Sequence, residues 1–547
     1  MARDPDEGDA FVFDLVDGDA PAGDAPPGPD GPGSPAVPGR RRRLTAQVAA
    51  VLAIVLGTAI GVDGALDHVR MERMRDLPGG VADLSSPLAQ TWAWSGAVGP
   101  GESTTDVAVL GDVLAVESDD GLVALDPHTG EVAWTVPLRD DADCGPMVPA
   151  TWPDPATPSL VCLQGTGGDR EVVAVGPDGP TSAPRLLDAA DARRYGVAHT
   201  GPDGTVLRAR RVGPLSDVDV GDAVCTSAGE CTGTVAEGRD LVLRAEDAAT
   251  GEERWTVTVP FRAVDATQCT RTFGASWGSS ETRLVISGQL APDAFGARIT
   301  ADLVDLTGCG IQAAVTPDGT VLGAELEPGK GRVRSLGGGE YAATSFEGLP
   351  RATLYAADGG VIGEITGYPL DARATDESEP ETVLGVDETG RRLRAYAVDG
   401  TPSWDITLQS GGQDFLAQVG DTVVVTTGAG GVRGLDRATG EERWAWDGSD
   451  PSEDDDVEYF GSVHVAQAFT DGEVLLLLTE GGAGGTQGLV ALDASSGAEV
   501  WVRAGGGPVT SFDPTDRGLV EQGVVGGLVA VDGNLLEVTP RGVRGLG

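Results

Sequence analysis

The stretch Leu122-Val-Ala-Leu-Asp126-Pro-His-Thr-Gly130-Glu-Val-Ala-Trp134 places a Gly four residues after an Asp, and a Trp four residues after that Gly. The same spacing recurs in three further stretches, Asp247-Ala-Ala-Thr-Gly251-Glu-Glu-Arg-Trp255, Asp436-Arg-Ala-Thr-Gly440-Glu-Glu-Arg-Trp444 and Asp493-Ala-Ser-Ser-Gly497-Ala-Glu-Val-Trp501. Only 10 of the 547 residues are Trp, and four of them occupy this position, so chance does not explain the pattern. A fifth copy is degenerate, because Asp399-Gly400 with Trp404 keeps the Gly-to-Trp spacing but shortens the turn. The chain is therefore built from repeats.

Each copy predicts a strand, a turn and a second strand. An apolar strand such as residues 122–125 ends at an Asp, whose carboxylate can accept backbone N–H groups of the turn. The Gly takes a positive φ, and the Trp is a large plate suited to the space between stacked sheets. Another strand pair precedes several copies, for example residues 107–116 and 415–426. The repeating unit is thus a four-stranded antiparallel meander.

Composition and repeat length together predict an all-β propeller. The 82 Gly and 35 Pro residues indicate many turns and argue against a helical bundle. A meander that repeats every roughly 40 to 60 residues is typical of a propeller blade. Residues 90–547 leave room for seven or eight blades, and we favour eight.

The Asp-x-x-Thr/Ser-Gly-x-x-x-Trp turn resembles the repeat of the pyrroloquinoline-quinone-like (PQQ-like) β-propeller proteins. That family includes quinoprotein alcohol dehydrogenases and a non-enzymatic scaffold lipoprotein of outer-membrane barrel assembly. The likeness is specific in the four full copies and weak between residues 260 and 400, where insertions and missing Trp obscure the blades. The resemblance implies that Trp134, Trp255, Trp444 and Trp501 dock one blade on the next.

One apolar segment predicts a membrane anchor. Residues 44–62 (LTAQVAAVLAIVLGTAIGV) carry no charge, and as a helix they span about 28 Å, close to one hydrocarbon core. Arg40, Arg41, Arg42 and Arg43 precede this segment, and Asp63 and Asp67 follow it. The positive-inside rule therefore places the N-terminus in the cytoplasm and residues 90–547 outside the cell membrane. A cleaved signal peptide and a buried core helix are the alternatives.

The anchor divides the chain into four regions. Residues 1–39 are rich in Asp, Pro, Gly and Ala, so we expect a disordered acidic cytoplasmic tail. Apolar and acidic residues interleave at residues 9–17, a pattern typical of docking motifs and equally consistent with a solvated tail. Residues 40–62 form the basic flank and transmembrane helix, residues 63–89 a stalk or linker, and residues 90–547 the propeller.

All six cysteines follow the predicted membrane segment, in the part expected to face an oxidising space. Short loop closure favours pairing of sequence neighbours, Cys144 with Cys162, Cys225 with Cys231, and Cys269 with Cys309. The five-residue loop of the second pair contains a glycine, Gly229, and makes it the firmest expectation. A zinc site is disfavoured, because the chain has no Cys-x-x-Cys and its four His are scattered.

Charge and motifs exclude several functions. The net charge of -47 repels phosphate backbones, and Lys330 is the only Lys, so no nucleic-acid partner is expected. Gly274-Ala-Ser276-Trp-Gly278 fits a nucleophile elbow, but a predicted strand follows it and the only later His is His464. A quinoprotein oxidoreductase would need, by resemblance, a stacking Trp, a vicinal disulfide and a calcium site, and no two Cys are adjacent.

Three acidic clusters could hold calcium, but none has EF-hand spacing, and we favour solvated acidic loops over specific calcium sites. They are Asp217 with Asp219 and Asp222, Asp447 with residues 450–456, and Asp376 with residues 377–381. We therefore expect no bound cofactor: PQQ is disfavoured and calcium is unsupported.

The sequence thus predicts a non-enzymatic, membrane-anchored and monomeric propeller that binds an unidentified extracytoplasmic protein. The alternatives are a quinoprotein oxidoreductase and a ligand sensor that signals through the cytoplasmic tail. The strand around Trp92 and Trp94 copies an outer repeat strand, whereas the last repeat, residues 527–538, has no Trp in the expected place. We therefore expect these two segments to share one blade, because a propeller must remove its open edge.

Overall fold

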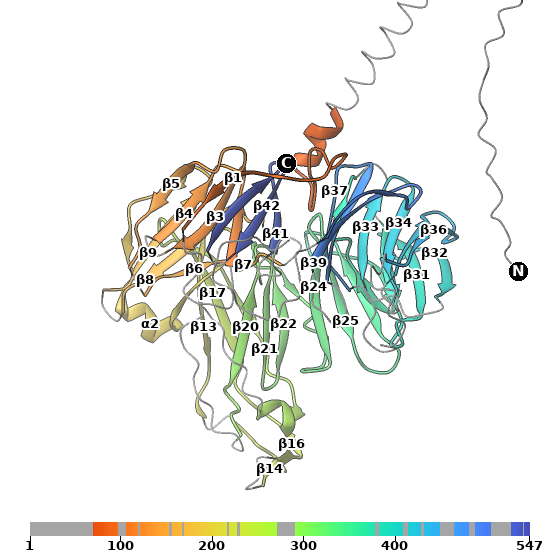
Figure 1. Cartoon of the computed structure of the whole chain (residues 1–547). Coiled ribbons are helices and arrows are strands. Elements are labelled where there is room, and N and C mark those ends of the chain that lie inside the picture. The colour runs from red at the N-terminus through yellow and green to blue at the C-terminus, as the bar shows by residue number, and fades with distance from the viewer. Residues whose placement is uncertain are drawn as a thin grey trace, which may run out of the picture. The chain divides into compact units, whose positions relative to one another are not determined.

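The computed structural model describes most of the chain after residue 68: residues 69–96, 106–118, 121–139, 141–151, 156–166, 169–215, 218–226, 230–270, 290–377, 382–408, 414–427, 431–448, 464–480, 487–504, 527–539 and 541–547. In these residues the chain forms nine sheets of four or five strands, which we call blades 1 to 9 in chain order (Figure 1), and two small two-stranded sheets. Eight of the blades follow one another along the chain, and the ninth combines strands from both ends of the propeller.

The first four blades have these strands. Blade 1 contains β2 (Asp106–Leu110), β3 (Val113–Ser118), β4 (Gly121–Leu125) and β5 (Val132–Val136). Blade 2 contains β6 (Asp143–Gly145), β8 (Leu160–Gln164), β9 (Glu171–Gly176) and β10 (Gly179–Pro180), with β11 (Arg185–Leu186) also paired to β9. Blade 3 contains β12 (Ala198–Thr200), β13 (Thr205–Arg211), β17 (Leu241–Asp247) and β18 (Glu253–Val259). Blade 4 contains β20 (Phe295–Ile299), β21 (Val304–Gly308), β22 (Ile311–Val315) and β23 (Val321–Leu322).

Blades 5 to 9 repeat the arrangement. Blade 5 contains β24 (Gly331–Gly337), β25 (Glu340–Ser345), β26 (Arg351–Tyr355) and β27 (Val361–Thr366). Blade 6 contains β28 (Tyr368–Leu370), β30 (Thr382–Val386), β31 (Arg392–Ala397) and β32 (Pro402–Thr407). Blade 7 contains β33 (Phe415–Val419), β34 (Thr422–Thr426), β35 (Val432–Asp436) and β36 (Glu442–Trp446). Blade 8 contains β37 (His464–Thr470), β38 (Val474–Glu480), β39 (Gln487–Asp493) and β40 (Glu499–Ala504), and blade 9 contains β41 (Gly527–Val531), β42 (Asn534–Thr539), β43 (Gly542–Leu546) and β1 (Gln90–Trp94).

Short elements lie between or beside the blades. The short strands β7 (Val148–Pro149) and β29 (Ala374–Thr375) extend the inner edges of blades 1 and 7, and α2 (Ala189–Tyr195) joins blades 2 and 3. Two small two-stranded sheets pair β14 (Val224–Cys225) with β15 (Cys231–Thr232), and β16 (Thr234–Val235) with β19 (Val264–Asp265). The 3-10 helix η3 (Ala266–Cys269) follows β19.

The prediction of seven or eight blades is wrong, because the described residues contain nine. The repeat spacing of 40 to 60 residues used for that prediction is too long for the compact blades in the middle of the chain. Blade 5, for instance, runs only from Gly331 to Thr366, with tight connections between its strands. Four-stranded antiparallel blades and an all-β ring are confirmed.

Apolar contacts between successive blades hold the ring together. Alternate residues of a strand point to opposite faces of its sheet, and in β4 both faces are buried. Val123 and Leu125 pack against blade 9, whereas Leu122 and Ala124 pack against blade 2. Among the described residues, nine such clusters occupy the nine boundaries between neighbouring blades, so the ring is closed.

The repeat turn forms as the sequence predicts. In the copy that begins at Asp493, Oδ1 accepts hydrogen bonds from the backbone N–H groups of Ser495 and Ser496, at 3.1 and 2.8 Å. The Gly497 N–H donates to the Asp493 carbonyl, and Gly497 has a φ of 70°. Hydrogen bonds from the two Ser side chains hold the pKa of Asp493 below its usual value. Hydrogen bonds within the turn therefore hold its backbone in one conformation, against which the neighbouring blade can pack.

The repeat Trp docks on the turn of the next blade, at the glycine. Trp444 of blade 7 donates its indole N–H to the carbonyl of Ala494 in blade 8, at 3.1 Å. Its ring lies against Gly497, where an added Cβ would come within 2.5 Å of Trp444 Cε3. The Gly therefore does two things: it adopts the positive φ, and it leaves room for the indole of the preceding blade.

An indole N–H donates to a backbone carbonyl at six of the nine boundaries in the described residues. At five of them the acceptor lies in the turn of the next blade, and at the sixth it is the Leu84 carbonyl, outside the blades. The six donors are Trp92, Trp134, Trp255, Trp404, Trp444 and Trp501. At the boundary of blades 2 and 3, Arg185 lies against Gly251 and donates from Nε to the Ala248 carbonyl at 3.0 Å. Thr320 packs on Gly359 between blades 4 and 5, and backbone packs on backbone at Gly363 between blades 5 and 6.

The predicted closure of the ring is confirmed. The strand β1 pairs with β43 in antiparallel register, with Trp92 opposite Gly545 and Trp94 opposite Val543. No turn joins β43 to β1, because these two strands come from opposite ends of the propeller sequence. The indole N–H of Trp501 therefore donates to a carbonyl outside the blades, that of Leu84, at 2.8 Å.

Residues 69–89, which the sequence analysis assigned to a stalk or linker, pack against blades 8 and 9, and we call this segment the clasp (Figure 1). Residues 69–75 are helical. Val81 donates to the Thr470 carbonyl, Ala82 donates to the Gly533 carbonyl, and Ala89 and Gly547 exchange two backbone hydrogen bonds. Leu84 is fully buried between the last two blades. The predicted membrane segment 44–62 lies outside the described residues, and no helix within them is long and apolar enough to cross a membrane.

Replacing Gly497 with Ala tests the docking of Trp444. We expect Gly497→Ala to lower the free energy of unfolding more than Gly420→Ala, since both glycines have positive φ but Gly420 has open space around its missing Cβ. The backbone penalty common to both variants is about 1–2 kcal/mol. Displacing the indole adds ~1–3 kcal/mol to the Gly497 variant only. Urea unfolding followed by Trp fluorescence measures both, and equal losses would contradict the docking role.

Candidate functional site

The three disulfides join the cysteine neighbours that the sequence favoured. Cys144 and Cys162 connect two paired strands of blade 2, β6 and β8. Cys225 and Cys231 link β14 to β15, and Cys269 joins η3 to Cys309 at the turn between β21 and β22 of blade 4. Two of the three disulfides thus stabilise a part of the chain that lies outside the blades.

That part is the projection, which we define as the described residues of 213–240 and 260–270. It comprises the connection between β13 and β17 of blade 3 and the start of the connection to blade 4 (Figure 1). A small apolar cluster holds it together, formed by Val235 and Val264 with the Cys269–Cys309 disulfide. In Figure 1, β14 and β16 lie at the end of the molecule farthest from β1 and β42.

The projection exposes apolar side chains to solvent. Leu215 is 70% exposed and Val224 is 65% exposed, and Val220 is partly exposed between them in the sequence. Asp219 and Asp222 lie in the same segment, where their carboxylates accept backbone N–H groups of Gly221 and Thr234. These exposed apolar residues, on a disulfide-stabilised segment outside the blades, make the projection a candidate interaction site.

A second candidate site is the central cavity, with a volume of about 760 Å³. Inner strands and connections of blades 4 to 8 line this cavity, together with the connection between blades 1 and 2, so it lies at the axis of the ring. Charged side chains of both signs face it, including Arg298, Asp302, Asp305, Arg332, Arg334 and Arg373.

Two of the cavity arginines have a structural role. Arg334 Nη1 donates to the Pro369 carbonyl at 2.8 Å and lies 3.3 Å from Asp371 Oδ1. Arg373 forms an ion pair with Asp414 at 3.0 Å and donates to the Ala466 carbonyl. These contacts connect neighbouring blades, so the charges of Arg334 and Arg373 are neutralised by protein groups.

Arg298, Asp305 and Arg332 form a separate group in the cavity wall. Arg298 in β20 lies directly opposite Asp305 in β21, and Arg332 comes from β24 of the next blade. Burial and the positive charge of Arg332 lower the pKa of Arg298. Burial raises the pKa of Asp305 to about 6, although both arginines act in the opposite direction. Desolvation therefore outweighs attraction at this carboxyl.

A third cluster of titratable groups lies between blades 1 and 2. Burial, with a smaller contribution from the charge of Asp143, raises the pKa of Glu117 in β3 to about 7. Burial also raises the pKa values of Asp143 and Asp106. Separately, His199 in β12 of blade 3 stays neutral, because burial and the charges of Arg170 and Arg208 lower its pKa to about 3. None of the described His, Cys, Asp and Glu residues gather into a group of three that could hold a metal ion.

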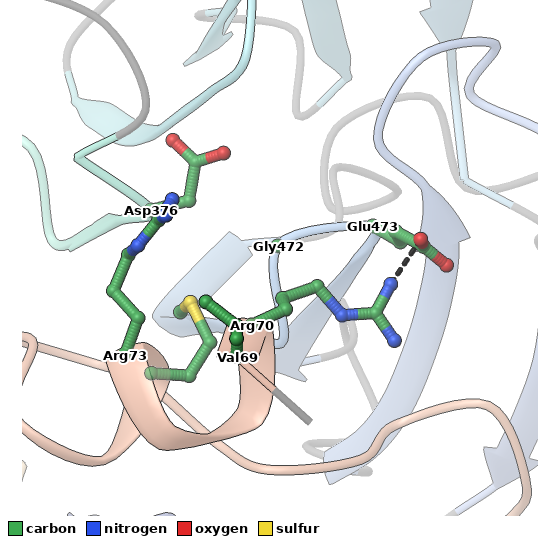
Figure 2. A pocket seen from close by; sticks show the side chains of 7 residues that line it. Val69, Arg70, Arg73, Asp376, Gly472 and Glu473 are labelled. Carbon is green, nitrogen blue, oxygen red and sulfur yellow. Dashed lines mark ion pairs between the residues drawn. The ribbon is translucent and has the colours of Figure 1, made fainter. Parts of the chain in front are cut away.

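The clasp forms the wall of a smaller pocket of about 280 Å³ against blade 8 (Figure 2). Arg70 of the clasp forms an ion pair with Glu473, and Arg73 points toward Asp376 from the same helical turn. The sequence predicted an acidic insertion at Asp376, and the structure instead shows its Oδ2 accepting the Gly420 N–H at 3.0 Å. We assign this pocket to attachment of the clasp.

Several other residues singled out in the sequence lie outside the part of the chain that the structure describes. Asp217, residues 274–278, residues 378–381 and residues 450–456 lie outside the described residues. Asp447 forms an ion pair with Arg433 at 2.6 Å. The repeat Asp, Gly and Trp residues all lie in turns and outer strands and none lines the described wall of the central cavity. Sequence reasoning missed Arg298, Asp305 and Arg332, because their blades lack the Trp repeat that made the others visible.

The described residues of the central cavity do not fit PQQ. The wall contains no Trp on which a planar quinone could stack, and no Cys, among the residues that the structure places there. No two cysteines are adjacent anywhere in the sequence. A quinone-dependent reaction therefore finds no support in the side chains of this cavity.

Comparison with known proteins places the repeat in a family. Residues 352–508, from β26 to just beyond β40, match the family described as outer membrane protein assembly factor BamB. The repeat, the blades and this match, which is confined to residues 352–508, support a PQQ-like β-propeller protein. No curated protein sequence matches the chain.

Solved propellers resemble the chain weakly. BamB from Moraxella catarrhalis is 13% identical over 84% of this chain and 97% of its own, with a TM-score of 0.33. Quinohemoprotein alcohol dehydrogenase from Comamonas testosteroni is 13% identical over 88% of this chain and 82% of its own, with a TM-score of 0.32. Sqt1 from Saccharomyces cerevisiae is 9% identical over 84% of this chain and 99% of its own, with a TM-score of 0.36. At such scores none of these proteins lends its activity to this chain.

Replacing Glu117 with Gln tests the buried carboxyl cluster. The folded state keeps the Glu117 proton up to a pH of about 7, whereas the unfolded chain releases it near its ordinary pKa. The wild-type protein therefore loses stability as the pH rises across this window. We expect the melting temperature of Glu117→Gln, relative to wild type, to be higher at pH 8 than at pH 5. Glu131→Gln, at an exposed position, is the control, and parallel profiles for all three proteins would contradict burial of the proton.

Proposed function

We propose that this protein is a membrane-anchored propeller that binds another protein outside the cytoplasm and acts as a scaffold. The observation that carries this proposal is the projection, with its two disulfides and its exposed apolar side chains Leu215 and Val224. Exposed apolar groups of this kind cost solubility, and a protein partner that covers them recovers that cost.

The disulfides and the charge distribution along the sequence support the proposed location. All six cysteines are paired in the described part of the chain, which suits an oxidising compartment. Arg40 to Arg43 before residues 44–62 favour a cytoplasmic N-terminus, and the propeller then lies on the other side. An oxidoreductase is the weaker alternative, because the described cavity wall lacks the side chains that a quinone would need.

Crosslinking in intact cells, followed by mass spectrometry, tests the scaffold role. We expect the wild-type chain to yield a discrete crosslinked protein, and the double variant Leu215→Asp with Val224→Asp to lose at least most of it. Val361→Asp is the matched control, since Val361 is 63% exposed on β27, outside the projection. Crosslinking that is unchanged in the double variant would remove the projection from the proposal.

Protease treatment of intact spheroplasts tests the membrane topology. With the N-terminus in the cytoplasm, added protease should digest the propeller and leave a protected fragment that contains residues 1–43. Antibodies against each end of the chain separate the two outcomes. A protected propeller with a digested tail would mean that the orientation is reversed.

A further inference from the structure

We propose that the central cavity binds a small organic or inorganic anion, whose carboxylate or phosphate group lies between Arg298 and Arg332. This ligand site goes beyond the proposed scaffold role and does not depend on it. The cavity volume, about 760 Å³, is within the range of pockets that enclose a small molecule.

The first step of the argument is the pair of like charges. Arg298 and Arg332 come from neighbouring blades, and the charge of Arg332 lowers the pKa of Arg298. No hydrogen bond or ion pair connects the Arg332 guanidinium to any other described side chain, in contrast to Arg334 and Arg373, which are paired. Two guanidinium groups held near each other cost electrostatic free energy, and a bound anion would turn this repulsion into attraction.

The second step is the Asp305 carboxyl, which interacts electrostatically with both arginines. Asp305 Oδ1 is buried and has no hydrogen-bond partner among the described residues. Once Asp305 is protonated, its O–H can donate to an anion in the cavity and its negative charge no longer competes with that anion. Asp305 is therefore suited to set the affinity of the site.

The third step is the backbone of the turn between β24 and β25, which lines the same cavity. Gly337, Gly338 and Gly339 line the cavity, and all three have positive φ, at 88, 56 and 82°. A Cβ added at Gly338 would meet no atom within 4 Å, so this loop borders open space. Successive amides in such conformations form concave sites that favour anions.

The other charged groups around the cavity either repel an anion or are already neutralised by a partner. Asp302 beside β20 accepts a hydrogen bond from the Thr300 hydroxyl at 2.8 Å, and Glu377 lies in the connection after β29. Arg334 with Asp371, and Arg373 with Asp414, neutralise each other. The local balance therefore depends on Asp305, which is the carboxyl in direct register with Arg298.

Isothermal titration calorimetry on the purified full-length chain in detergent tests the site. The probes are citrate and inorganic phosphate, with glucose as a neutral comparison, at pH 5 and pH 8. We expect citrate or phosphate to bind and glucose to give no heat. Relative to Asp305→Asn, the wild type should bind the same probe more weakly at pH 8 than at pH 5, because Asp305 is protonated at pH 5; this ratio cancels the change in the probe's own charge. Preference for citrate over phosphate identifies an organic acid, and the reverse preference identifies a phosphate compound.

Three variants make the result specific to these side chains. Arg332→Gln should raise the dissociation constant about tenfold or more. Asp305→Asn should lower it at pH 8 by about three- to tenfold and leave only the pH dependence that comes from ionisation of the probe. Arg351→Gln is the control, since Arg351 is exposed on β26 away from the cavity. Circular dichroism melts confirm that each variant is folded. Failure of both anions to bind the wild-type chain, or unchanged binding by Arg332→Gln, would overturn the proposal.

Discussion

The contact between an outer-strand side chain and the turn of the next blade controls much of this structure. A single four-stranded sheet cannot cover its own two apolar faces, so each blade is stable only between two neighbours. The contact fixes their spacing at the outer edge, where the wedge between blades is widest. Because the indole N–H needs an acceptor and the ring needs room, the turn must offer a carbonyl and a glycine at fixed positions. One interaction therefore explains the Asp, the Gly and the Trp of the repeat together.

The sequence revealed the fold only where this contact uses Trp. Four copies predicted the turn, its hydrogen bonds and the positive φ of Gly130, Gly251, Gly440 and Gly497, and the structure has all of them. Arg185, Thr320 and Gly363 occupy the equivalent boundaries of blades 2 to 6, and none of these residue types stands out in a sequence. For this reason the sequence analysis predicted seven or eight blades, whereas the described residues form nine. The charged group of the central cavity was missed for the same reason, since it belongs to blades 4 and 5.

Arginine has several roles in a strongly acidic protein. At the boundary of blades 2 and 3, Arg208 and Glu246 are 2% and 3% exposed, and Arg185 reaches the same carboxylate at 3.4 Å. Such a buried pair does little for net stability but penalises any neighbour that would leave one charge unpaired. It therefore specifies which blade packs where. At five other boundaries Trp provides this match through shape, and Arg185 provides it here through charge.

The shared ninth blade also bears on how the chain folds as it is made. Its strands β1 and β43 pair Gln90 with Leu546, positions that are 546 - 90 = 456 residues apart, so their contact is among the most non-local that the chain can form. Contacts of this kind form late, because a long loop must first be closed. During synthesis β1 therefore remains without its partner strand, and the ring stays open, until β43 has emerged. A chain cut short just before β43 would keep nearly all of its core and yet remain an open arc, exposed to aggregation and proteolysis.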